Sequence, residues 1–353
     1  MSDTAGTARR TAPGGSDRPL TEAYDTALLD LDGVVYAGPD AIEYAAQSLD
    51  AARAAGMRLA YVTNNASRPP RVVAEHLTEL GVPAEAADVI NSAQAAARLV
   101  ADKVPAGSKV LVVGGAGLLE AVAERGLVPV RSLDEGPVAV VQGYDPSVGW
   151  QQLAEAAYAV QQGLPWVASN TDLTIPTARG IAPGNGTLVA AVRAAAGVDP
   201  EVAGKPMPPM HRETVLRTGA KRPLVVGDRL DTDIEGAHNG GVDSLLVFTG
   251  VTTPALLLAA PAEHRPTYLA ADLRGLLLAQ PAVLPVADGG FACGGWTASV
   301  QDGVLRLDGV GEDRYDGLRA LCAAAWTALD SDAGGDTGSG AVDGRKALAD
   351  LGF

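Results

Sequence analysis

The sequence predicts an α/β protein built on parallel sheets, and two patterns support that prediction. Short aliphatic runs recur along the chain at 25–31, 57–63, 108–114, 137–143, 164–170, 222–228 and 243–248. Between them lie longer Ala- and Leu-rich amphipathic stretches, such as 41–56, 70–81 and 149–163. Strands that alternate with helices indicate βαβ units and a parallel sheet. Near-continuous Val and Leu runs fit strands that are buried on both faces.

Length and composition limit the classes of protein to consider. A chain of 353 residues is longer than one hydrophobic core usually serves, so we expect two or three domains. No apolar run reaches the ~18 residues that a membrane span needs. Residues 1–20 are rich in polar residues, Gly and Pro, and no apolar core follows Arg9 and Arg10. We therefore expect a disordered tail rather than a signal peptide.

Charge and cysteine usage narrow the partners and the compartment. The formal net charge of -15 argues against nonspecific nucleic-acid binding, which requires a basic surface. Cys293 and Cys322 show no metal-ligand spacing, so we expect free thiols and a reducing cytoplasm.

The first chemical feature is Asp30-Leu31-Asp32-Gly33, which ends the first aliphatic run. Residues two apart on a strand point to the same side, so the two carboxylates converge where the strand ends. Like charges this close require a shared proton or a cation. A carboxylate nucleophile beside a proton-transferring carboxyl, with Mg²⁺ between them, is suited to phosphoryl transfer. Two solvated aspartates in a turn are the alternative.

Two further strand ends carry polar residues. The run 57–63 leads into Thr63, Asn64 and Ser67, where a hydroxyl and free N–H groups at a helix start suit a phosphate. Ser67 ahead of two prolines also reads as an ordinary helix N-cap.

The run 222–228 ends in Gly227-Asp228, with Asp231 and Asp233 following. Mg²⁺ prefers oxygen ligands, so Asp228 is the best candidate and Asp233 the second. We expect Asp231 to face solvent or to cap the next helix. Lys205 could neutralise a carboxylate and the transferring phosphoryl group, or it could be a solvated surface charge.

This order of motifs, from DxDG(T/V) through a hydroxyl residue and a Lys to GDxxxxD, resembles the haloacid dehalogenase superfamily of phosphatases. The resemblance implies that Asp30 is the nucleophile that forms an aspartyl-phosphate. It implies that Asp32 protonates the leaving alkoxide and then acts as the base for water. The implied phosphate-binding residues are Thr63, Asn64, Lys205 and Gly33. The implied Mg²⁺ ligands are Asp30, Asp32 through its main chain, Asp228 and Asp233.

The stretch from Thr63 to Lys205 is too long for one crossover, so it must hold an inserted domain. The segment 169–188 resembles the cap signature of the subfamily with a large α/β cap. That subfamily includes phosphoglycolate, pyridoxal phosphate and nucleotide phosphatases. The candidate cap residues for contact with substrate are Asp145, Asn170, Asp172 and Arg179. For Arg179, a surface role is the alternative. The predicted divisions are a tail at 1–20, the core at 21–93 and 199–280, the cap at 94–198, and an α+β extension at 281–353.

The extension and the residues of several motifs are similar to those of the actinobacterial glycerol 3-phosphate phosphatases. The extra C-terminal domain of that family looks acetyltransferase-like. No acyl-CoA loop of the form Q-x-x-G-x-G/A is present, so we expect no acetyl transfer. The resemblance implies a cytoplasmic Mg²⁺-dependent hydrolase of a small phosphate ester, with glycerol 3-phosphate leading over phosphoglycolate, pyridoxal phosphate and nucleotides. A non-catalytic protein that senses a phosphorylated metabolite is the alternative from another class. Whether the protein is a homo-oligomer stays open.

Overall fold

The computed structural model describes residues 10–177, 179–332 and 342–353. The chain divides into two compact units, one of residues 1–59 with 220–353 and one of residues 60–219. Each unit is described by itself. All the predicted strands are present, as β1, β4, β6, β8, β9, β13 and β14.

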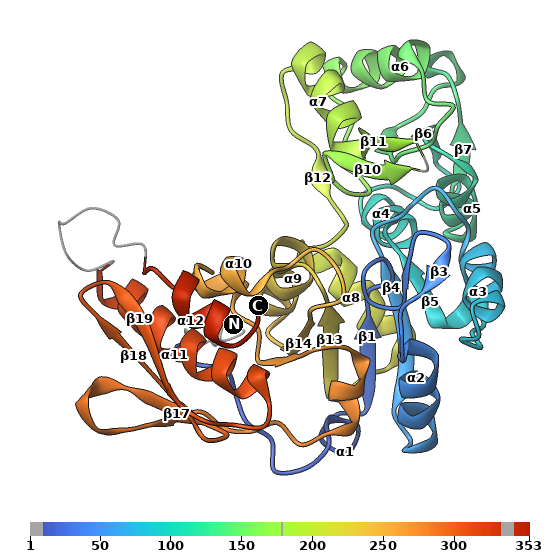
Figure 1. Cartoon of the computed structure of the whole chain (residues 1–353). Helices are drawn as coiled ribbons and strands as arrows, with labels where there is room; N and C mark the ends of the chain where they lie inside the picture. Colours follow the sequence, from blue (N-terminus) through green and yellow to red (C-terminus); the bar gives the residue numbers. More distant parts are fainter. Residues whose placement is uncertain (1–9, 178, 333–341) are drawn as a thin grey trace, which may run out of the picture. The chain divides into compact units, whose positions relative to one another are not determined.

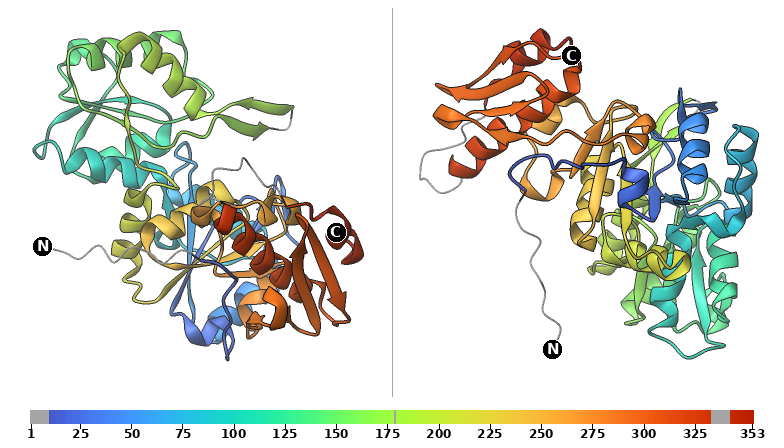
Figure 2. Two further views of the ribbon diagram at one scale, coloured as in Figure 1. Left: turned by 90° about the vertical axis from the view of Figure 1, so that its left-hand side faces the viewer. Right: turned by 90° about the horizontal axis from the view of Figure 1, so that it is seen from below.

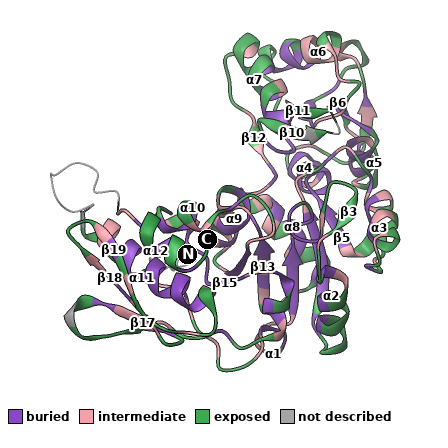
Figure 3. Ribbon diagram, viewed as in Figure 1, coloured by how far each residue is buried: buried purple, intermediate pink, exposed green. Residues whose placement is uncertain are grey.

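The first unit contains four parallel strands in the order β15-β14-β13-β1. These strands are β1 (Thr26–Leu29), β13 (Pro223–Gly227), β14 (Asp243–Val247) and β15 (Tyr268–Ala270). The accompanying elements are α1 (Leu20–Ala23), β2 (Tyr36–Ala37), β3 (Asp40–Ala41), α2 (Ala45–Ala54), a π-helix (Leu230–Ile234), α9 (Glu235–Gly240) and α10 (Pro254–Leu258). All of β1 and most of β13 and β14 are buried (Figure 3). Because the strands are parallel, the segments that follow them meet at one edge of the sheet.

The C-terminal extension belongs to the first unit. Its antiparallel sheet has the order β16-β17-β18-β19. Its elements are β16 (Leu284–Pro285), β17 (Phe291–Cys293), β18 (Trp296–Gln301), β19 (Val304–Gly309), α11 (Arg314–Asp332) and α12 (Arg345–Asp350). Helix α11 lies against this sheet in Figure 1 and in both views of Figure 2.

The extension shares one hydrophobic core with the parallel strands. Leu318, Leu321 and Trp326 of α11 pack in the same cluster as Leu246 of β14 and Leu269 of β15. Buried apolar area is the main favourable contribution to folding. The extension is therefore integrated into the first unit rather than tethered to it.

The prediction of a disordered tail at 1–20 disagrees with the structure over part of its length. Residues 1–9 of the predicted tail lie outside the described residues. Further along it, the N–H groups of Gly14 and Ser16 donate to the carbonyl oxygens of Thr267 and Gln280. Cys293 and Cys322 are free, as predicted, and both are buried. No helix in the described ranges combines the length and the apolar character needed to cross a membrane.

The second unit contains a parallel five-stranded sheet in the order β12-β9-β8-β6-β7. Its strands are β6 (Lys109–Val113), β7 (Val128–Val130), β8 (Ala139–Gln142), β9 (Trp166–Ala168) and β12 (Glu201–Val202). Helices α6 (Trp150–Gln161) and α7 (Asn185–Ala196) share a core cluster with β6, β8 and β9. The hairpin of β10 (Thr174–Thr177) and β11 (Gly180–Pro183) was not predicted.

The same unit also holds the parallel pair β4 (Arg58–Thr63) and β5 (Val89–Asn91). The remaining α-helices of the described part of this unit are α3 (Pro70–Glu79), α4 (Ser92–Ala101), α5 (Ala116–Glu124) and α8 (Pro208–Thr218). The side chain of Asn91 accepts the N–H of Gln94, and the side chain of Gln94 accepts the N–H of Asn91. This capping box explains why α4 begins directly after β5.

Candidate active site

Three carboxylates of the first unit come together beyond the ends of its strands. Asp30 follows β1 directly, and its N–H still donates to the carbonyl oxygen of Val226 at 2.9 Å. Asp228 follows β13, and Asp233 lies in the π-helix. Carboxylate oxygens of all three lie within 4.8 Å of one another. Asp228 is 0% exposed and Asp233 is 1% exposed.

The donor set and the space around it fit Mg²⁺. Negative charges at this separation destabilise one another, and burial increases the cost. Carboxylate oxygens are the ligands that Mg²⁺ prefers. Neighbouring glycines leave room beside the carboxylates. A Cβ on Gly33 would lie 2.6 Å from Asp228 Oδ2, and a Cβ on Gly250 would overlap the same oxygen.

Asp32 lies outside this group of three carboxylates. It sits in a tight turn in which the carbonyl oxygen of Leu31 accepts the N–H groups of Val35 and Tyr36 at 2.9 and 3.1 Å. Gly33 has φ 88°, a conformation that a side chain would strain, so glycine is required in this turn. Although Asp32 keeps contact with solvent, partial desolvation of its carboxyl raises its pKa, and a hydrogen bond from the Gly38 main chain acts in the opposite direction.

Asp231, which lies between Asp228 and Asp233 in the sequence, faces solvent as predicted. Its side chain is 58% exposed and accepts hydrogen bonds from Arg229 at 2.7 and 3.1 Å. Asp231 is therefore exposed to solvent, whereas Asp233, two residues further along, is buried.

In the second unit, the side chain of Asn64 holds the main chain of Lys205. Asn64 Oδ1 accepts the Lys205 N–H at 2.8 Å, and its Nδ2 donates to the Lys205 carbonyl at 3.0 Å. The ammonium of Lys205 donates to the carbonyl oxygen of Val62, at 3.1 Å. Thr63 Oγ1 accepts the N–H of Asn65 at 3.1 Å. The structure thus brings three predicted phosphate-binding residues together, with the Asn64 side chain serving to position Lys205.

Two of the predicted substrate contacts join the same network. Asn170 Nδ2 donates to the Asn64 carbonyl oxygen at 2.7 Å, and Asn64 Nδ2 donates to Asp172 Oδ2 at 3.3 Å. The other two are elsewhere in this unit. Asp145 accepts the N–H and hydroxyl of Ser147, and Arg179 is exposed in the turn between β10 and β11. Asn170 and Asp172 are the members of this set with a link to the Thr63–Lys205 cluster.

Two features were missed by sequence reasoning. One is a buried carboxylate, Glu213 of α8, which receives hydrogen bonds from Arg98, Arg125 and Arg217. The other is the loop 249–252 after β14, whose Val251 N–H donates to Asp228 Oδ2 at 2.6 Å. The spacing of Glu213 and Arg217 signals no more than an i,i+4 pair. The residue types at 249–252, Thr-Gly-Val-Thr, give no indication that this loop lies beside a carboxylate.

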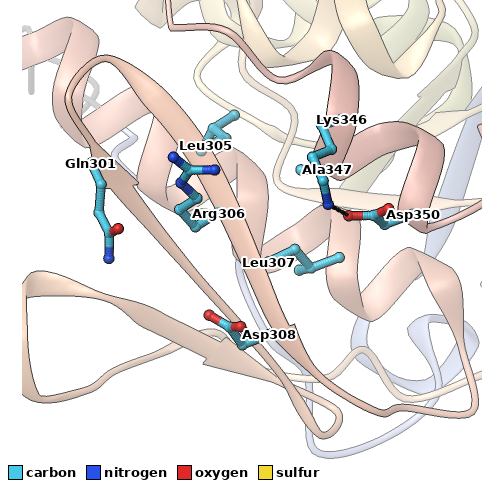
Figure 4. A pocket seen from close by; sticks show the side chains of 8 residues that line it. All are labelled: Gln301, Leu305, Arg306, Leu307, Asp308, Lys346, Ala347 and Asp350. Carbon is cyan, nitrogen blue, oxygen red and sulfur yellow. Dashed lines mark hydrogen bonds and ion pairs between the residues drawn. The ribbon is translucent and has the colours of Figure 1, made fainter.

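A separate hollow of about 300 Å³ lies in the extension (Figure 4). Its lining residues are Gln301, Leu305, Arg306, Leu307, Asp308, Lys346, Ala347 and Asp350. Lys346 donates to Asp350 at 2.8 Å, and Arg306 and Asp308 lie two residues apart on β19. Its cationic and acidic side chains balance, so it shows no preference for a charged ligand.

Three family models match the chain. Residues 27–128 match a haloacid dehalogenase-like hydrolase, and residues 202–276 match a second HAD-hydrolase-like model. Residues 293–353 match a GCN5-related N-acetyltransferase like domain. The first two contain the carboxylates and Lys205, and the third covers most of the extension.

Curated relatives and solved structures agree with these matches. The chain is 44% identical to D-glycerol 3-phosphate phosphatase of Mycobacterium tuberculosis, with 89% of each chain covered. It is 38% identical to acid sugar phosphatase of Staphylococcus aureus, with 65% of this chain and 88% of the relative covered. A crystal structure of glycerol phosphate phosphatase from M. tuberculosis in complex with magnesium matches with a TM-score of 0.84 and 42% identity. It covers 95% of this chain and 99% of that chain.

Proposed function

The chain belongs to the haloacid dehalogenase-like hydrolases, and on this premise we propose that it is a Mg²⁺-dependent phosphatase that converts glycerol 3-phosphate to glycerol and inorganic phosphate. The observation that carries the choice of substrate is the similarity to D-glycerol 3-phosphate phosphatase. That similarity covers 89% of this chain. Residues 1–280 alone make up a smaller share of the chain, so the similarity also includes part of the extension. The acid sugar phosphatases cover 65% of this chain, which makes a sugar phosphate the second candidate.

In the proposed reaction, Asp30 is the nucleophile. A carboxylate oxygen of Asp30 attacks phosphorus, and the bond between phosphorus and the glycerol oxygen breaks as Asp32 gives that oxygen its proton. Asp32 then takes a proton from water, whose oxygen attacks the aspartyl-phosphate. Asp30 regains its carboxylate and inorganic phosphate leaves. The raised pKa of Asp32 agrees with a proton donor, while its assignment rests on its place in the family motif.

The residues that would hold the ion and the phosphate follow from the same motifs. Asp30, Asp228 and Asp233, with the main chain of Asp32, would coordinate Mg²⁺, and the grouping of the three carboxylates supports this. When bound, Mg²⁺ supplies positive charge that offsets the carboxylates and the transferring phosphoryl oxygens. The proposed phosphate-binding residues are Thr63, Asn64, Lys205 and Gly33. Asn64 would act by fixing the main chain of Lys205, which its two hydrogen bonds support.

We also propose the predicted division into a core at 21–93 and 199–280, a cap at 94–198, an extension at 281–353 and a tail at 1–20. The family models at 202–276 and 293–353 fall within the proposed second core segment and the extension and support these two parts, whereas the model at 27–128 runs past residue 93 into the proposed cap. Asp145, Asn170, Asp172 and Arg179 remain the cap residues proposed to select the substrate. A cap that closes over the site would exclude bulk water while the aspartyl-phosphate forms.

The partner is a small phosphate ester, and the acidic chain argues against nucleic acid. We propose a cytoplasmic location because both cysteines are free, as expected in a reducing compartment.

Hydrolysis measured with and without Mg²⁺ tests the proposed function. The kcat/KM for glycerol 3-phosphate should exceed that for a sugar phosphate, phosphoglycolate, pyridoxal phosphate and UMP. Excess EDTA should abolish the activity. Asp30→Asn should lower kcat by about 10⁴-fold or more, because the nucleophile is lost.

Asp231→Asn is the matched control, because Asp231 is exposed, pairs with Arg229 and is not a member of the carboxylate group. It should keep the wild-type kcat. Binding of glycerol 3-phosphate without turnover would instead indicate a sensor. Activity that survives in Asp30→Asn would remove the nucleophile assignment.

A further inference from the structure

The loop 249–252 connects β14 to α10 and passes beside the carboxylate group. Its sequence is Thr249-Gly250-Val251-Thr252, and none of these residues is a candidate metal ligand or acid. The side chain of Val251 is 60% exposed, so it contributes little to the core. The hydrogen bonds that this loop makes to Asp228 and Gly33 come from two main-chain N–H groups and one hydroxyl.

The main chain of the loop holds Asp228 at two points. The N–H of Val251 donates to Asp228 Oδ2 at 2.6 Å, and the N–H of Thr252 donates to the Asp228 carbonyl oxygen at 3.2 Å. Hydrogen bonds to a charged acceptor are stronger than neutral ones. The first bond fixes the rotation of the carboxylate, and the second fixes the backbone that carries it.

The other two residues set how closely the loop approaches. A Cβ on Gly250 would overlap Asp228 Oδ2, so the main chain reaches this oxygen because Gly250 has no side chain. Thr249 Oγ1 donates to the carbonyl oxygen of Gly33 at 2.6 Å. Gly33 lies in the turn that follows Asp30, so the loop is bonded to both strand ends that carry the candidate ligands.

We infer that the loop 249–252 is a positioning element of the Mg²⁺ site. The Val251 amide orients the Asp228 carboxylate, and the Thr249 hydroxyl fixes the turn at Gly33. Ligand geometry must be held within about 0.5 Å, and losing a supporting hydrogen bond typically costs 10–100-fold in metal affinity. This inference rests on the proposed function, which supplies the identity of the metal ion.

The first test measures Mg²⁺ affinity by calorimetry on the full chain without substrate. Gly250→Ala should bind Mg²⁺ about 10-fold or more weakly, because the added Cβ displaces Asp228 Oδ2. Gly149→Ala is the matched control, since its Cβ would come no closer than 3.6 Å to any residue other than its two chain neighbours. It should keep the wild-type affinity. Circular dichroism shows whether each variant is folded.

A second pair of variants decides the question if Gly250→Ala does not fold. Thr249→Val keeps the shape of the side chain and removes the hydroxyl, whereas Thr249→Ser keeps the hydroxyl. Thr249→Val should weaken Mg²⁺ binding several-fold, measured by the same calorimetry on the full chain. Thr249→Ser should restore the wild-type value.

The positioning role would be overturned if folded Gly250→Ala kept the wild-type Mg²⁺ affinity. It would also be overturned if Thr249→Val and Thr249→Ser bound Mg²⁺ with equal affinity. Either result would leave the phosphatase assignment intact. Conversely, a chain that binds Mg²⁺, loses affinity in these variants and hydrolyses no phosphate ester would keep the positioning role and refute the proposed function.

Discussion

The two units differ in the charges that surround their buried carboxylates. In the second unit, three arginines converge on one carboxylate, Glu213, whose side chain is 0% exposed. In the first unit, three carboxylates converge within 4.8 Å of one another. The arginine cluster brings an excess of positive charge to its acid, while the carboxylate group concentrates negative charge.

The difference distinguishes a structural site from a site built for a ligand. Burial alone would raise the pKa of Glu213, but hydrogen bonds from Arg98 and Arg217 and the charge of Arg125 together lower it. Glu213 also ties α8 to Arg98 of α4 and to Arg125 at the end of α5. In the carboxylate group, like charges oppose one another, and a divalent cation would stabilise the arrangement.

The largest expected effect comes from removing the charge of Glu213. Glu213→Gln should lower the free energy of unfolding by about 3 kcal/mol, because three guanidinium groups lose their common acceptor charge. The arginines are partly exposed, and solvent limits the loss. Urea unfolding of the full chain measures it.

Glu120→Gln is the control for that measurement. Glu120 pairs with Arg71 on the surface, at 44% and 60% exposure. The change should alter the free energy of unfolding by no more than about 0.5 kcal/mol. Equal losses in the two variants would show that burial does not distinguish the Glu213 cluster from a surface pair.

The sequence allowed the carboxylate group to be predicted and left the arginine cluster hidden, for a physical reason. Parallel strands place the residues after them at one edge, so Asp30 and Asp228 could be associated from strand order. The partners Arg98 and Arg125 lie 115 and 88 residues from Glu213, and no strand period links them. Their meeting depends on how helices pack.

The loop 249–252 was missed for a different reason. Its contacts with Asp228 come from N–H groups that every residue except proline carries, and from the absence of a Cβ at Gly250. Sequence motifs record side chains, so a site held by main-chain atoms leaves little signal. The residues of the cap signature at 169–188 do not by themselves predict the β10–β11 hairpin.

A smaller effect should appear when Glu213 is titrated rather than replaced. The pKa of Glu213 is lowered in the folded state. The stability that its charge contributes is therefore fully present at pH values above the ordinary glutamate pKa range. It is lost as the pH falls through that range towards the folded-state pKa. The difference in unfolding free energy between wild type and Glu213→Gln should therefore shrink on acidification. A difference that stays constant from pH 7 to well below the ordinary glutamate range would show that the charge of Glu213 is not responsible.

The smallest effect, with the opposite sign, is expected for Asp233→Asn in the presence of chelator. Asparagine keeps an oxygen that can accept the Arg229 N–H, as Asp233 Oδ2 does at 3.2 Å, while one negative charge leaves the group. Reduced repulsion should raise the free energy of unfolding by on the order of 1 kcal/mol.

Adding Mg²⁺ should reverse this order of stability. Wild type gains about 2.7 kcal/mol when free Mg²⁺ is 100 times its dissociation constant, and the variant, with weaker binding, gains less. Urea unfolding in EDTA and in Mg²⁺ measures both. A loss of stability in EDTA like that of Glu213→Gln would mean that Asp233 serves the fold as Glu213 does. The carboxylate group would then be a second structural cluster and not a place prepared for a cation.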